Sequence, residues 1–206
     1  MGGVCNKTTD CFTAIVGGIL NTASSVSTFV GGGCSNRAQS PNNAIVGGTN
    51  NLNSACQGFM GAGANNSMDL SCCSILVGGC TNCIQSNSNQ AVIVGGGGNC
   101  IKAGSGLPAF CSHNSFIGGG CLNTINNCSD CTRFSFLGGG CRNLITKDHA
   151  VIVGGNLNTA SAECGGILGG CNNYISHDYS FGIGTHLTSS ATCTTYVNNF
   201  HSTGSL

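Results

Sequence analysis

Residues 14–23 read AIVGGILNTA and residues 151–160 read VIVGGNLNTA, so one pattern occurs twice at positions far apart in the chain. Its centre is a glycine pair, or in one copy Ala-Gly, followed by two free positions and an Asn. The steps in sequence number between successive motif Asn positions are 15, 15, 15, 15, 16, 17, 24, 20, 15 and 15. Chance does not keep so regular a step, so repetition is the dominant feature of the sequence. The eleven motif residues are Asn6, Asn21, Asn36, Asn51, Asn66, Asn82, Asn99, Asn123, Asn143, Asn158 and Asn173.

A repeat this short has no room for two helices or for a strand with a helix. It suits one coil of a β-solenoid, which has two short strands and two turns and rises by about 4.8 Å. The glycine pair supplies a positive φ at a tight corner, and Asn tolerates the same backbone region and hydrogen-bonds nearby backbone. We therefore predict an all-β fold, a parallel β-solenoid of about eleven coils over residues 1–184, with an Asn ladder at the corners. Residues 185–206 lose the motif and are predicted to form an extended strand or neck.

The strand before each corner is apolar on both of its faces. A large aliphatic residue three positions before the second glycine is expected to fill the coil, as Ile15 and Ile152 do in the two quoted copies. Its neighbours point the other way and are also apolar, with a Gly second in the four strands that begin with Phe29, Phe59, Phe116 or Phe136. A strand that is apolar on both faces is buried on both faces, so we expect other copies of the chain to cover the outer one. The expected interface residues are Phe29, Phe59, Phe116, Phe136, Val46, Val77, Val94 and Val153.

This pattern resembles the head repeats of trimeric autotransporter adhesins, which also occur in fibre proteins of phages and giant viruses. In both, a short alternating apolar strand ends in Gly and is followed by a polar turn, and the repeat has a similar short period. The resemblance covers roughly residues 2–185 and implies a left-handed parallel β-roll, a side-by-side homotrimer and a role as a structural and adhesive fibre. A virion fibre or extracellular filament, able to join end to end, is the leading interpretation, and a bacterial trimeric adhesin head is the alternative.

Composition narrows the functional classes. Charged residues make up 6% of the 206 residues and the net charge is zero, so the sequence carries no electrostatic footprint for nucleic acid. No apolar run reaches the length of roughly 18 residues that a membrane-spanning helix needs, so membrane insertion is not expected. The five His residues share no motif with a Cys or a carboxylate, and Glu163 is the only Glu. We therefore expect no enzyme activity, no metal site and no cofactor.

Seventeen cysteines are present, and several share a repeat position with a cysteine of the next coil. Stacked Cα atoms about 4.8 Å apart fall within the range that a disulfide spans. Four coil-to-coil disulfides are therefore predicted, with a ladder of free thiols as the alternative. The remaining nine cysteines are left unassigned. The predicted pairs are Cys56 with Cys72, Cys83 with Cys100, Cys111 with Cys131, and Cys121 with Cys141.

The two longest intervals insert extra residues at about 101–114 and 125–133. Insertions in repeat proteins often form the binding side, so Lys102, His113, Asp130 and Arg133 are candidate binding residues for a cell-surface or glycan receptor. A carbohydrate-binding or carbohydrate-processing solenoid that uses the loops of 101–133 is accordingly a further alternative. An extracellular or virion-surface location is expected, and three sequons mark candidate glycosylation sites at Asn6, Asn65 and Asn127.

Overall fold

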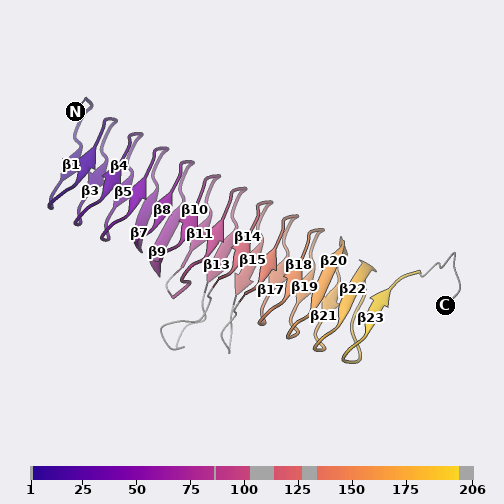
Figure 1. The fold of residues 1–206 in the computed structure, drawn as a ribbon. Helices are drawn as coiled ribbons and strands as arrows, with labels where there is room; N and C mark the ends of the chain where they lie inside the picture. The colour runs from indigo at the N-terminus through magenta and orange to yellow at the C-terminus, as the bar shows by residue number, and fades with distance from the viewer. Residues whose placement is uncertain (1, 86, 103–113, 127–133, 200–206) are drawn as a thin grey trace, which may run out of the picture.

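The computed structural model describes residues 2–85, 87–102, 114–126 and 134–199. Over these residues the chain is an all-β parallel solenoid of about eleven turns without a helix, as predicted. Figure 1 shows the turns following one another along a rod, with the two ends of the chain at its opposite ends. Each regular turn contributes one strand to each of two sheets, which face one another across a narrow core.

The first sheet, called sheet A here, has twelve strands, and the second, sheet B, has eleven. The strands of sheet A are β2 (Ala14–Ile15), β4 (Phe29–Val30), β6 (Ala44–Ile45), β8 (Phe59–Met60), β10 (Ile75–Leu76), β12 (Val92–Ile93), β14 (Phe116–Ile117), β16 (Phe136–Leu137), β18 (Val151–Ile152), β20 (Gly166–Cys171), β22 (Phe181–Thr185) and β23 (Thr195–Val197). The strands of sheet B are β1 (Lys7–Thr8), β3 (Thr22–Ala23), β5 (Arg37–Ala38), β7 (Leu52–Cys56), β9 (Ser67–Cys72), β11 (Cys83–Ile84), β13 (Cys100–Lys102), β15 (Thr124–Asn126), β17 (Leu144–Ile145), β19 (Thr159–Ala160) and β21 (Tyr174–Ile175).

All strand pairs are parallel and join equivalent positions of successive turns, so the repeat step of the sequence is also the register of the sheets. Ala14 pairs with Phe29 in sheet A, and Thr22 pairs with Arg37 in sheet B. The inward-facing residue of each strand from β2 to β22 is buried, and these residues form the core between the two sheets. The buried column of sheet A is Ile15, Val30, Ile45, Met60, Leu76, Ile93, Ile117, Leu137, Ile152 and Ile167.

The corner after each sheet A strand depends on its second glycine. At Gly140, for example, φ is +86°, and an added Cβ would lie 2.1 Å from the carbonyl oxygen of Gly155 in the next turn. The second positive φ of the corner falls on the residue before the motif Asn, such as Leu157 at 56°. The motif Asn residues themselves have no positive φ, contrary to the expectation that they share the left-handed region, and from Asn21 onward their side chains are buried.

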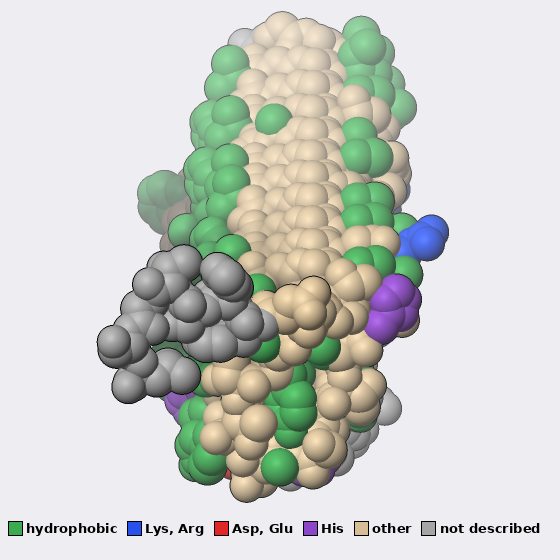
Figure 2. All heavy atoms as spheres, turned by 90° about the vertical axis from the view of Figure 1, so that its right-hand side faces the viewer, with side chains coloured by type: hydrophobic (Ala, Val, Ile, Leu, Met, Phe, Trp, Pro, Cys, Tyr) green, Lys and Arg blue, Asp and Glu red, His purple; other side chains and the backbone are tan. Residues whose placement is uncertain are grey.

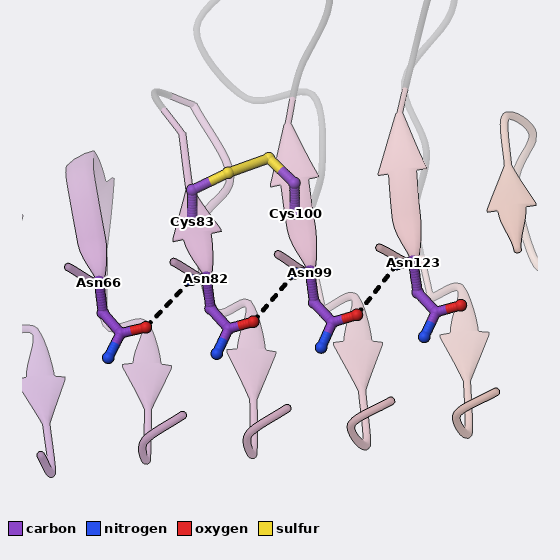
Figure 3. The surroundings of a disulfide bond; sticks show 6 residues. All are labelled: Asn66, Asn82, Cys83, Asn99, Cys100 and Asn123. Atoms are coloured by element: carbon purple, nitrogen blue, oxygen red, sulfur yellow. Dashed lines mark hydrogen bonds between the residues drawn. A yellow bond between two sulfur atoms is a disulfide. The ribbon is translucent and has the colours of Figure 1, made fainter. Parts of the chain in front are cut away.

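The motif Asn side chains form a continuous ladder through the rod (Figure 3). In turn after turn the Asn Oδ1 accepts the backbone N–H of the next Asn, at N–O distances of 2.9 to 3.1 Å. Asn99 Nδ2, for example, donates to the carbonyl oxygens of Gly95 and Gly120. From Asn21 to Asn173 these residues are at most 1% exposed, so the ladder satisfies corner groups that water does not reach.

Residues 185–206 were expected to form an extended strand or neck, and their described part contains the strand β23. The boundary after residue 184 falls inside β22, and β23 pairs with β22 in parallel, so the chain extends sheet A by one strand. Leu187 donates its N–H to Asn173 Oδ1, at the position that an Asn holds in earlier turns. Thr188 also bridges Tyr174 beside sheet B. The turn has lost the motif, but the Leu187 backbone N–H still supplies a donor to the Asn173 side chain, so the last Oδ1 of the ladder is paired.

Candidate functional site

The outer surface of sheet A carries two columns of apolar residues, which we call the apolar face. One column contains the first residue of each strand, from Ala14 in β2 to Phe181 in β22, and each of these residues pairs with its equivalent in the next turn. The other contains the residue two positions further on, from Val16 to Ile183. None of these residues is charged. Figure 2 shows hydrophobic side chains in rows along the solenoid beside a strip of backbone and other side chains.

The eight residues expected at an interface lie on this face and point away from the core. Phe116 is half-buried. The other seven are between 39% and 50% exposed, and they are Phe29, Phe59, Phe136, Val46, Val77, Val94 and Val153.

The pairing of Phe with Gly has a geometric reason. The Phe136 ring lies along its strand. A Cβ placed on Gly138 would be 2.4 Å from the Val153 carbonyl oxygen of the next turn and 3.3 Å from Phe136 Cε1, so backbone and ring together leave no room for it. Phe116 and Gly118 have the same arrangement at 3.3 Å. The two Phe rings stack on one another, with centroids 5.3 Å apart and planes at 3°. The rings therefore fill the space that a valine occupies in other turns, which keeps the apolar face even.

Two edges border the apolar face, and the described free cysteines lie on them. Edge 1 is the turn shortly before each sheet A strand, together with the ends of β7 and β9 that lead into it. Edge 2 is the corner that follows the glycine pair, and in one turn this corner is the end of β20. All of these thiols are exposed or half-exposed. Edge 1 carries Cys11, Cys56, Cys72, Cys73, Cys164 and Cys193, and edge 2 carries Cys5, Cys34, Cys80, Cys121, Cys141 and Cys171.

One of the four predicted disulfides is present. Cys83 and Cys100 are bonded across adjacent strands of sheet B, with Cα atoms 4.7 Å apart (Figure 3). The other predicted pairs within the described residues are in register but remain free thiols, which differs from the prediction, and they are Cys56 with Cys72 and Cys121 with Cys141.

Register alone does not form a disulfide between stacked turns. In-register side chains point in parallel, so both thiols must tilt toward one another before they can bond. The fourth predicted pair, Cys111 with Cys131, lies outside the described residues.

The thiols around Cys72 influence one another. Burial, followed by the neighbouring Cys56 and Cys73, raises the pKa of the Cys72 thiol above its ordinary value. A small cavity of about 150 Å³ adjoins it, lined by Ser40, Pro41, Ser54, Cys56, Leu70, Ser71 and Cys72. Because the thiolate is the nucleophile, Cys72 is a weak nucleophile near neutral pH.

The candidate binding residues are only partly within the described structure. Lys102 is half-buried at the end of β13, where it pairs in register with Asn126 of β15. His113, Asp130 and Arg133 lie outside the described residues, so the structure does not test a common surface for the four.

The three sequons differ in accessibility. Asn65 is exposed, at a φ of 55°. Asn6 is half-buried, and its Nδ2, the atom that would carry a glycan, donates to the Gly18 carbonyl oxygen at 2.9 Å. Asn127 lies outside the described residues.

A second cavity was not anticipated from the sequence. It has a volume of about 230 Å³ and is lined by Lys147, Asp148, Glu163 and Asp178. The three carboxylates follow one another at the repeat period, which stacks them on edge 1, and Glu163 N–H donates to Asp178 Oδ1 at 2.8 Å. That spacing was the sequence signal for it. Within the described residues, no group of three or more His, Cys, Asp or Glu side chains is arranged to hold a metal ion.

Comparison with known proteins gives no match, neither to a protein-family model nor to a curated protein. Among the described residues, no helix is long and apolar enough to span a membrane.

Proposed function

We propose that this chain is a non-enzymatic structural and adhesive fibre protein that assembles as a side-by-side homotrimer of left-handed β-rolls. The apolar face carries this proposal. It extends from Ala14 to Ile183 without a charged residue, and seven of the eight expected interface residues are 39–50% exposed. Soluble monomers rarely expose a continuous apolar surface of this extent, because covering it releases water.

A second copy of the chain is the partner that fits this face best. Both rods rise by one strand spacing per turn, so parallel copies keep their apolar columns in register over the whole length. A globular partner has no such period. The face also lacks charges that would select an oppositely charged partner. The resemblance to trimeric adhesin heads favours three copies, the left-handed coil and a location on a virion or outside the cell.

Light scattering after size exclusion, in reducing buffer, tests the proposal. We expect a mass three times that of the 20.5 kDa chain. Val153→Asp should dissociate the assembly, because the trimer brings three carboxylates together in an apolar environment. Tyr174→Asp, on the outer surface of sheet B, is the matched control, since Tyr174 is 45% and Val153 50% exposed. A monomeric wild-type mass at micromolar concentration refutes the proposal.

Negative-stain electron microscopy of native material separates two forms of the fibre. Separate rods of about 50 Å, eleven turns of one strand spacing each, indicate discrete heads. Continuous fibres indicate that the rods also join end to end.

A further inference from the structure

The twelve described free cysteines lie on the two edges of the apolar face and not on the face itself. The only described disulfide lies elsewhere, on sheet B. If the apolar faces of three chains pack together, the edges of neighbouring chains meet, and the thiols on these edges then lie near one another. This distribution has a consequence for the proposed trimer, on which the following inference rests.

Parallel rods around a common axis bring unlike edges together. A rotation about an axis parallel to the rod keeps every residue at its height and turns edge 1 of one chain toward edge 2 of the next. Each edge 1 side chain therefore meets the corner of the same turn in the neighbouring chain. An antiparallel pair behaves differently, because it brings like edges together at opposite heights.

Within the described residues, two turns carry a cysteine on both edges at equivalent repeat positions. In one turn Cys73 lies on edge 1 and Cys80 on edge 2, and five turns further along Cys164 and Cys171 hold the same two positions. Cys73 and Cys164 share a positive φ, 55° and 51°, at the tip of their turns. We propose that interchain disulfides form between Cys73 and Cys80 of neighbouring chains, and between Cys164 and Cys171.

These four cysteines lack a bonding partner stacked within their own chain. The Cys73 thiol contacts Gln57 Oε1 at 3.1 Å, and Cys80 is bridged by Ala64 and Gly97 in the adjacent turns. Mostly extended chain, spanning roughly 20 Å, separates Cys73 from Cys80, which is far beyond disulfide range. A bond between these positions therefore requires two chains.

The corresponding turn further along has the same property. Cys171 is bridged to Asn156 in the preceding turn and pairs with Thr185 in the following one. Cys164 has His149 and Tyr179 at its repeat position in the turns on either side. The two turns thus offer equivalent sites about 24 Å apart along the rod, at one strand spacing per turn.

The oxidant is a low-molecular-weight disulfide. The Cys80 thiolate attacks it, forming a mixed disulfide and releasing one thiolate. The Cys73 thiolate of the neighbouring chain then attacks the Cys80 sulfur and releases the second. Two protein thiols are thereby oxidised, one disulfide molecule is reduced to two thiols, and the two thiol protons are taken up by the released thiolates.

The test uses the full chain, reduced, freed of reductant and then exposed to oxidised glutathione. Non-reducing gels should show dimers and then trimers, which reductant converts back to monomers. The double variant Cys80→Ser/Cys171→Ser should form at least ten-fold less crosslinked product. Cys34→Ser/Cys141→Ser removes two thiols from the same edge and is the control, which should crosslink like the wild type.

The outcomes separate the two proposals. Peptide mapping should recover Cys73 linked to Cys80 and Cys164 linked to Cys171. A trimeric mass in reducing buffer with only monomers on the oxidised, non-reducing gel refutes the crosslinks and leaves the trimer intact. Recovery of edge 1 peptides linked to edge 1 peptides refutes the parallel arrangement, and a monomeric mass in reducing buffer refutes the proposed function itself.

Discussion

Replacing one ladder residue, Asn158→Ala, tests whether the Asn ladder holds the turns together. Asn158 is fully buried, and its Oδ1 accepts the N–H of Asn173 at 3.1 Å. Its Nδ2 donates to the carbonyl oxygens of Gly154 and Gly170, both at 3.1 Å. Alanine leaves all three backbone groups without this partner, in a corner that is buried from solvent.

The expected loss of stability follows mainly from these three bonds. Asn158 Oδ1 also accepts from Asn173 Nδ2 at 3.0 Å, but that amide keeps the carbonyl oxygens of Gly169 and Gly184 as acceptors. The orphaned N–H of Asn173, a residue 1% exposed, costs about 1–3 kcal/mol in the free energy of unfolding, and each lost bond to a carbonyl about 1 kcal/mol. Gly170 keeps one donor, the N–H of Asn156 at 2.9 Å. The sum is about 3–5 kcal/mol. With a urea m-value of about 2 kcal/mol per molar, the midpoint falls by about 2 M.

The control for this measurement is Asn156→Ala in the same corner. Asn156 is exposed, and its side chain makes only a 3.9 Å contact with Cys171 Sγ. Its loss should change the free energy of unfolding by at most about 0.5 kcal/mol. Both variants are measured at one protein concentration, because assembly adds to apparent stability. Equal urea midpoints for Asn158→Ala and Asn156→Ala refute the reasoning. So does a hydrogen-exchange rate of the Asn173 amide that is no faster in Asn158→Ala than in the wild type.

Two further predictions concern a corner glycine and a thiol. Gly140→Ala should prevent folding, because its φ is +86° and a Cβ would lie 2.1 Å from backbone, whereas Gly139→Ala meets no atom within 4 Å and should fold. Circular dichroism distinguishes them, and two equally folded variants contradict this reading of the corner. Because its pKa is raised, Cys72 should reach its half-maximal alkylation rate at a higher pH than an unperturbed thiol. Cys56→Ser should lower the pH at which Cys72 alkylation is half-maximal. An unchanged pH profile, measured by mass spectrometry, contradicts a contribution of Cys56 to the raised pKa.

The fold was predictable because the repeat encodes it many times. A single strand such as Val151–Ile152 is too short to be identified alone, but ten successive repeat intervals set the register of both sheets. Burial of the Ile152 column and exposure of its neighbours follow from strand alternation. The volume exchange between Phe and Gly was visible too, although its cause, a ring lying along the strand at Phe136, required coordinates.

Other features were not predictable. They depend on the direction in which side chains point, or on a residue outside the motif that supplies a hydrogen bond from its backbone. The sequence places Cys121 and Cys141 in register as clearly as Cys83 and Cys100, and only the latter pair is bonded. Leu187 is an example of the second kind, since its backbone N–H donates to Asn173 Oδ1 although no motif Asn stands at that position. Periodicity predicts position well, but it does not predict which chemical group fulfils the role there.

The Asn ladder and the apolar face depend on each other through the rise per turn. Each ladder bond joins an Asn side chain to the backbone of the next turn, which fixes the separation of adjacent strands in sheet A as well. Parallel rods match along their length only if that separation is uniform, because a small error per turn accumulates over eleven turns. The proposed trimer therefore requires the ladder. At urea concentrations where Asn158→Ala is still folded, its assembly should already be weakened, while Asn156→Ala assembles normally. Light scattering across a urea series measures both, and an Asn158→Ala variant that dissociates only when it unfolds contradicts this coupling.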